Sequence, residues 1–102
     1  MARKGYLLAE VKVFDSKHFQ TEYASKVNAI LSEFGGVVIV ADDDPKVVEG
    51  GRDVSRVVII EFESTDRLKE FYESDVYQTI APERLRSAHS HLYMLAGVQV
   101  LA

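Results

Sequence analysis

The most informative segment of the chain is RVVIIEF, residues 56–62. Its run of β-branched residues from 57 to 60 is typical of a buried strand. Successive side chains of a strand point to opposite faces, so Val57, Ile59 and Glu61 share one face. Apolar residues also occupy the other face. The segment therefore predicts a strand that is apolar on both sides apart from one acid.

An equally apolar segment, YLLAEVKVF, occupies residues 6–14. Its two charges, Glu10 and Lys12, fall on one face of the predicted strand. Asp15 then offers an N-cap for a helix, because its carboxylate can accept hydrogen bonds from the first free amides. Gly35-Gly36 predicts the end of that helix. Between them, apolar residues recur at helical spacing, at positions 19, 23, 27, 30, 31 and 34.

The remaining elements are marked by β-branched runs, caps and breaks. Residues 37–41 predict a strand that ends in an acidic turn, 42–45, and Val47-Val48 predicts a short returning strand. Ser64 and Ser74-Asp75 predict the starts of two further helical stretches. Because Pro82 disfavours the α conformation at the preceding residue, a kink or restart is expected at Ala81. Residues 91–98 predict the last strand.

The resulting order is β-α-β-β-α-β, the split βαβ arrangement. Right-handed crossovers place the first and third strands in the centre of a four-stranded antiparallel sheet, with the helices on one face. The predicted fold class is therefore α+β, ferredoxin-like. The helix-free face would carry Tyr6, Leu8, Glu10, Lys12, Val37, Ile39, Val57, Ile59, Glu61, His91, Tyr93 and Leu95. Such an apolar face predicts a homodimer in which two sheets pack together as a dimeric α/β barrel.

Composition limits the class of protein. The 102 residues suit a single domain, 1–102, and the absence of cysteine excludes disulfides and thiolate metal sites. The absence also suits a reducing cytoplasm, which is the expected location. A net charge of −4 with scattered basic residues argues against nucleic-acid binding. No apolar run is long enough to predict a membrane span or a signal peptide.

Four segments resemble a known family, the domain of unknown function 1330, within the dimeric α/β-barrel superfamily. These segments are 34–36 (FGG), 49–50 (EG), 56–62 (RVVIIEF) and 71–77 (FYESDVY), and the likeness extends over nearly the whole chain. Family members often carry Trp in the position of Phe71 and Pro in that of Asp75. The resemblance implies a ferredoxin-like fold and a dimer, but the family has no settled activity.

Glu10 and Glu61 are acids in otherwise apolar strands, and both are predicted on the helix-free face. A carboxyl desolvated there would have a raised pKa and could serve as a general acid or base. The alternative is a buried structural ion pair with Lys12, Arg56 or a group of the partner chain. The two acids could also lie too far apart to cooperate.

His91 is the second candidate catalytic residue, because an imidazole titrates near neutral pH. His89 lies two residues before it, but a metal site would need a further ligand, and His18 is remote in sequence. No metal is therefore expected. No cofactor is expected either, since glycine-rich phosphate loops, nucleophile elbows and dinucleotide fingerprints are all absent. The only asparagine, Asn28, lies mid-helix, so the chain does not match the residue pattern that related haem-degrading barrels use.

Several side chains are candidates for holding a ligand. Arg56, at the start of its strand, could bind a carboxylate or phosphate through two parallel hydrogen bonds, or could instead pair with Glu49 or Asp53. The other candidates are aromatic or cationic residues predicted at the rim or on the helix-free face: Tyr23, Tyr77, Arg84 and Tyr93, with Glu10.

Three functions remain compatible with the sequence. The first is a dimer that binds a small organic ligand between or beside its sheets. The second is a cofactor-independent enzyme, an isomerase or monooxygenase-like catalyst, with Glu61 or His91 as its base. The third is a structural dimer without a ligand. A cavity of several hundred Å³ would favour the first two.

Overall fold

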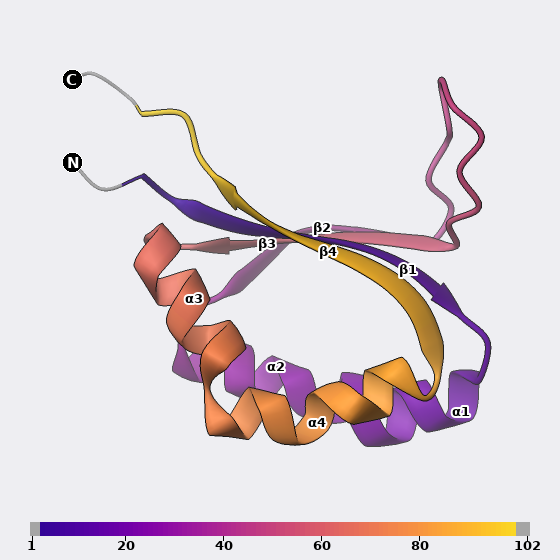
Figure 1. Ribbon diagram of the computed structural model, residues 1–102, viewed down its shortest axis with the longest axis horizontal. Coiled ribbons are helices and arrows are strands. Elements are labelled where there is room, and N and C mark those ends of the chain that lie inside the picture. The colour runs from indigo at the N-terminus through magenta and orange to yellow at the C-terminus, as the bar shows by residue number, and fades with distance from the viewer. Residues whose placement is uncertain (1–2, 100–102) are drawn as a thin grey trace.

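A four-stranded antiparallel sheet forms one layer of the structure (Figure 1), a computed structural model that describes residues 3–99. The strands are β1 (Gly5–Val13), β2 (Val37–Asp42), β3 (Arg56–Phe62) and β4 (Ala88–Ala96). They are ordered β2-β3-β1-β4. The predicted ferredoxin-like α+β arrangement, with the first and third strands in the centre, is therefore confirmed.

The second layer consists of helices, all on one face of the sheet (Figure 1). They are α1 (Ser16–His18), η1 (Phe19–Ala24), α2 (Ser25–Glu33), α3 (Thr65–Glu73) and α4 (Asp75–Leu85). The predicted caps are present: Asp15, Ser64 and Ser74 accept hydrogen bonds from the backbone N–H groups of His18, Arg67 and Tyr77. Gly35 ends α2 at a φ of 75°, a conformation that glycine adopts without steric cost.

The first helical segment differs from the regular helix that its spacing predicts. Residues Phe19–Ala24 form a π-helix, in which the N–H of Ser25 bonds to the carbonyl of Gln20. The rings of Phe19 and Tyr23 pack in a tilted arrangement, with their centroids 5.3 Å apart. Single π-turns are rare and occur frequently at functional sites. Here the π-helix supplies part of a cavity wall.

Two smaller predictions are wrong. Val47-Val48 forms no strand, since neither residue pairs with the sheet and Val48 is 90% exposed. The restart predicted at Ala81 is also wrong, because the helix α4 continues through Pro82 to Leu85. Burial of Ile80, Ala81 and Arg84 against the rest of the fold outweighs the local preference of proline.

The core lies between the two layers. Leu7, Ile60 and Phe62 of the sheet pack against buried residues of the helices, including Leu68 and Phe71. Phe71 is fully buried, and its ring contacts three other rings, those of Phe34, Phe62 and Tyr77. A smaller cluster of Val11, Phe19 and Ala88 lies toward the other end of the sheet.

The opposite face of the sheet, which we call the free face, carries no helix (Figure 1). Tyr6, Leu8 and Glu10 of β1 lie opposite Glu61, Ile59 and Val57 of β3, and opposite Leu95, Tyr93 and His91 of β4. This placement confirms the predicted face. In β2, Val37 lies opposite Glu61, whereas a bulge between Val38 and Val40 leaves Ile39 out of the register and places Val40 opposite Ile59.

The segment 43–55 between β2 and β3 leaves the sheet on the side opposite to the helices and rises past the free face (Figure 1). Gly50 adopts a φ of 82° within it. In the part of the chain from 3 to 99, no helix is long and apolar enough to cross a membrane.

Candidate functional site

A cavity of about 160 Å³ lies between the helices and the sheet. Most of its lining is apolar and comes from β1, β3, η1 and α2, with single contributions from β2 and β4. Four polar side chains interrupt that lining: Tyr23, Asn28, Arg56 and Arg84. Of the side chains that the sequence marked as candidates for holding a ligand, Tyr23, Arg56 and Arg84 line this cavity.

Arg84 is the most unusual of the four. The residue is only 6% exposed, although arginine is almost never fully buried without a partner. Its Nη1 donates a hydrogen bond to the hydroxyl of Ser90 on β4, and its guanidinium lies 5.9 Å from the centre of the Tyr23 ring. Its Nε is buried and has no hydrogen-bond acceptor. Arg84 is thus a buried cation with an unsatisfied donor.

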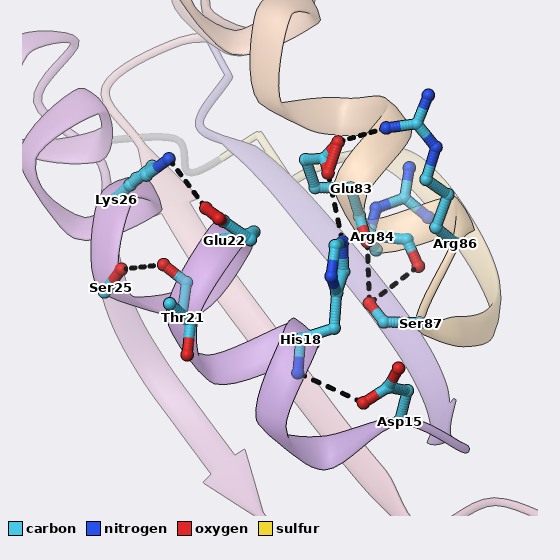
Figure 2. A network of polar contacts seen from close by, with 10 residues as sticks. All are labelled: Asp15, His18, Thr21, Glu22, Ser25, Lys26, Glu83, Arg84, Arg86 and Ser87. Atoms are coloured by element: carbon cyan, nitrogen blue, oxygen red, sulfur yellow. Dashed lines mark hydrogen bonds and ion pairs between the residues drawn. The ribbon is translucent and has the colours of Figure 1, made fainter.

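The nearest acid in sequence does not neutralise Arg84. The Glu83 carboxylate turns toward His18, at 3.0 Å, and toward Arg86, as Figure 2 shows. Among residues 3–99, no carboxylate forms an ion pair with Arg84, and none lines the cavity. A buried charge without a counter-charge is costly, so the charge of Arg84 opposes folding in the single chain.

Two tyrosines lie beside Arg84. The hydroxyls of Tyr23 and Tyr77 share a hydrogen bond of 2.8 Å, and their rings pack edge to face. Burial, followed by the neighbouring Tyr77, raises the pKa of Tyr23. Tyr23 therefore stays protonated and acts as a hydrogen-bond partner rather than as a base. Tyr77 is fully buried in the core, where it packs against Tyr23. It does not lie at the rim, as the sequence suggested.

Arg56 enters the cavity from the opposite side. Its guanidinium pairs with Asp43, not with the predicted Glu49 or Asp53. A wider and more open depression adjoins the cavity and shares Phe19, Ala24, Asn28 and Arg56 with it. Asp43 lines this depression as well. Arg56 and Asp43 thus stand at the mouth of the cavity, whereas Arg84 stands inside it.

Glu61 lies away from the cavity, on the free face. Its carboxylate accepts hydrogen bonds from Lys4 and Tyr6, each at 3.1 Å. These two donors, Lys4 first, lower the pKa of Glu61. The raised pKa expected for a general base is therefore not found in the single chain. The structural ion pair is the observed arrangement, although with Lys4 in place of the predicted partners.

Glu10 is held separately at the other end of the free face. It pairs with Arg52 of the segment 43–55, and hydrogen bonds from Arg52 to Tyr93 and Glu10 raise the pKa of the guanidinium. In the register, Glu10 and Tyr6 are four positions apart along β1, and Tyr6 is the residue opposite Glu61. Four positions correspond to about 13 Å at the usual rise of a strand. The two acids do not form a pair.

The histidines do not gather. His91 lies opposite Glu10 on the free face, His89 packs against the ring of Phe14, and His18 pairs with Glu83 on the helical layer. No group of three or more potential metal-ligating side chains occurs among the residues described. His91 is therefore on the same face as Glu61 but on the opposite face from the cavity.

The sequence did not predict that Asn28 lines the cavity. This mid-helix asparagine lines both the cavity and its mouth. A polar residue one position after Val27, on the helix edge next to the apolar stripe, was the available signal. The depth of Arg84 had no such signal, because a charged residue near a helix end is usually solvated.

The fold and the cavity together define a class, an α+β domain with a mostly closed apolar cavity between its helices and its sheet. The chain belongs to the family named domain of unknown function 1330, whose model matches residues 4–98. There is no match among curated proteins.

Solved structures with the same fold include a protein of unknown function from Rhodopseudomonas palustris. It is 16% identical, has a TM-score of 0.81, and the match covers 98% of this chain and 86% of that one. SnoaB, a cofactor-independent oxygenase from Streptomyces nogalater, is also 16% identical, with a TM-score of 0.66 and 98% of both chains covered. HapK from Hahella chejuensis is 15% identical, with a TM-score of 0.64 and 96% and 94% covered. At these identities the likeness establishes the fold alone.

Proposed function

We propose that this protein binds a small organic acid in the cavity between its helices and its sheet. The observation that carries the proposal is Arg84, a cation that is 94% buried, unpaired with any described carboxylate, and part of an otherwise apolar wall. A ligand with an apolar body and one anionic oxygen matches such a wall. Its carboxylate would supply the missing counter-charge and form charge-assisted hydrogen bonds with the guanidinium.

The position of this cavity modifies the ligand hypothesis drawn from the sequence. That hypothesis placed the ligand with Arg56, Glu61 and Tyr77, between or beside the sheets. The residues that meet at the cavity are instead Arg84, Tyr23 and Arg56, while Glu61 lies on the other face of the sheet. The proposed site is therefore formed by one chain.

The test uses benzoate as the probe, with benzyl alcohol as its uncharged counterpart. We expect benzoate to raise the melting temperature of the wild-type protein, benzyl alcohol to raise it less, and Arg84→Met to remove that difference. Arg86→Met is the matched control, because it removes an exposed arginine of the same helical end that pairs with Glu83 and not with the cavity. Equal responses to benzoate in the wild type and in Arg84→Met would exclude an anion site at Arg84.

The second candidate function is a cofactor-independent enzyme of the oxygenase or isomerase type. Its specific support is that SnoaB, described as a cofactor-independent oxygenase, shares this fold. The described lining of the cavity contains no carboxylate and no imidazole, so proton abstraction there lacks a base. In this candidate, Glu61 or His91 would act on the free face instead. Glu10 lies opposite His91 there, and Tyr93 is on the same strand as His91.

Glu61→Gln separates the two candidates. The organic-acid proposal expects this variant to retain the benzoate response, because Glu61 is not part of the cavity. The enzyme candidate expects loss of ligand binding or turnover at an unchanged melting temperature. A much lower melting temperature would assign Glu61 a structural role. Native mass spectrometry of freshly purified protein would show whether a ligand is carried and by how many subunits.

We also propose that the protein forms a homodimer through the free face. Tyr93, Leu8, Ile59 and Val40 form an uncharged row across the four strands of this face, and Tyr93 and Val40 at its ends are 43% and 39% exposed in the single chain. Exposed apolar patches of this kind mark interfaces. A second copy would cover the patch by a two-fold packing of sheets. Sedimentation velocity tests the proposal, and a monomer at micromolar concentration would overturn it.

A further inference from the structure

Two arginines reach the same cavity from opposite sides. Arg56 of β3 and Ser90 of β4 both lie opposite Val11 of β1, so the three residues form a row across the helix-facing side of the sheet. Arg84 reaches this row through its hydrogen bond to Ser90. Since neighbouring strands are about 4.8 Å apart, the Cα atoms of Arg56 and Ser90 are separated by roughly 10 Å. Val11, Arg56 and Arg84 all line the cavity.

The two ends of the cavity differ in charge and in access to water. At the inner end, Arg84 is a buried cation without a carboxylate among residues 3–99. At the mouth, Arg56 is accompanied by Asp43, whose side chain is 78% exposed. The inner end therefore selects a negative charge. The mouth offers a donor and an acceptor side by side, which suits a group that can both accept and donate a hydrogen bond.

The size and lining of the cavity limit the body of the ligand. Its volume is about 160 Å³, and most of its lining side chains are apolar, including Leu7, Val11 and Val58. An apolar cavity of about 150 Å³ accommodates one benzene ring. A single six-membered ring therefore fills the space, whereas a fused polycyclic ligand would not fit without movement of the helices.

We propose that the cavity accepts a monocyclic aromatic carboxylate that carries a hydroxyl on the ring carbon opposite the carboxylate. The carboxylate binds Arg84, the ring fills the apolar centre, and the hydroxyl accepts a hydrogen bond from Arg56 and donates one to Asp43. This assignment rests on the proposed function and adds the class of ligand. A second carboxylate in place of the hydroxyl is disfavoured, because it would meet the Asp43 carboxylate at the mouth.

The experiment is isothermal titration calorimetry with three probes: benzoate, 4-hydroxybenzoate and benzene-1,4-dicarboxylate. In the wild type, 4-hydroxybenzoate should bind roughly tenfold more tightly than benzoate, as expected for one hydrogen bond to a charged group. The dicarboxylate should bind more weakly than 4-hydroxybenzoate. Arg56→Met should lower the affinity for 4-hydroxybenzoate more than the affinity for benzoate, so that the preference for 4-hydroxybenzoate falls.

Two further variants sharpen the result. Asp43→Asn removes the repulsion at the mouth, so the dicarboxylate should gain affinity relative to 4-hydroxybenzoate. Arg56→Lys retains the charge and should keep part of the preference for 4-hydroxybenzoate, provided that circular dichroism shows the wild-type fold. If Arg56→Met fails to fold, Arg56→Lys serves as the test variant in its place.

The failures of the two proposals are distinguishable. If benzoate binds through Arg84 but the hydroxyl adds no affinity, or if Arg56→Met leaves the preference unchanged, the ligand class is wrong and the organic-acid site stands. If neither benzoate nor 4-hydroxybenzoate binds the wild type, both are overturned. Binding of 4-hydroxybenzoate that survives Arg84→Met would also overturn both, because the carboxylate would then lie elsewhere.

Discussion

The two faces of the sheet differ in whether their charged side chains are paired. On the free face, Glu61 has Lys4 beside it and Glu10 has Arg52. On the helix-covered face, Arg84 is buried and forms no ion pair with a carboxylate among residues 3–99. Charged pairs on an exposed surface contribute little to folding, whereas an uncompensated buried charge opposes it.

This difference shows where to look for function. Glu10 and Glu61, the two acids in apolar strands, form ion pairs with cations of their own chain. The unsatisfied group lies beneath the helices, where the apolar cavity meets Arg84. Unmet hydrogen-bonding and charge requirements point to a ligand more directly than the presence of titratable residues does.

The largest expected effect is the difference in the free energy of unfolding between a variant of the core and a variant of the exposed helix surface. Phe71→Ala removes a fully buried ring that contacts Phe34, Phe62 and Tyr77, and should lower the free energy of unfolding by about 3–5 kcal/mol. Val76→Ala, a truncation at a 47% exposed position of α4, should change it by less than about 0.5 kcal/mol. Urea denaturation measures both. Similar losses for the two variants would contradict the placement of the core.

The next effect concerns the free face. The double variant Ile59→Ala and Leu95→Ala should weaken the proposed dimer about 100-fold, equivalent to about 2.8 kcal/mol, because both truncations remove interface area. Sedimentation velocity over a dilution series measures the change, and Val76→Asp on the helical layer is the control. An unchanged sedimentation profile for the double variant would refute sheet-to-sheet packing.

A smaller effect is expected from the tyrosine pair of the covered face. Tyr23→Phe removes the 2.8 Å hydrogen bond to Tyr77 and leaves a buried hydroxyl without its partner, so stability should fall by about 1 kcal/mol. Tyr72→Phe is the matched control, since its ring also packs on Tyr77 but no hydrogen bond of its hydroxyl is described. Thermal and urea denaturation should rank the two variants in that order. The reverse order would show that the hydroxyl pair does not stabilise the covered face.

The smallest expected effect is the pH dependence of the free face. Because Lys4 and Tyr6 lower the pKa of Glu61 below 4.5, their contribution to stability is present above pH 4.5 and is lost as the pH falls through the folded-state pKa. Glu61→Gln should therefore show a shallower loss of stability below pH 4.5 than the wild type. Glu63→Gln, at an exposed position nearby, is the control. Identical acid profiles for Glu61→Gln and the wild type would remove the stabilising role of this contact.

Much of the fold followed from local patterns. The apolar runs in residues 6–14 and 56–62, the caps at Asp15, Ser64 and Ser74, and the stop at Gly35 predicted the element order and, through it, the sheet. These signals are local because strand parity and the free amides of a helix end depend on neighbouring residues only. The π-helix at Phe19–Ala24 and the passage of α4 through Pro82 were not predictable in this way, since packing across the layers stabilises both.

The candidate site divides in the same manner. By itself the sequence determined which face of each strand is apolar, which acids lie on the free face, and that Tyr23, Arg56 and Arg84 were candidates for a ligand. Only the tertiary structure decided that these three residues meet at one cavity beneath the helices, and that Glu61 and His91 do not. The physical reason is that burial and counter-charge are properties of contacts between distant segments. Arg84 belongs to α4, and it is buried beside the cavity because its guanidinium packs against Tyr23 of η1 and bonds to Ser90 of β4.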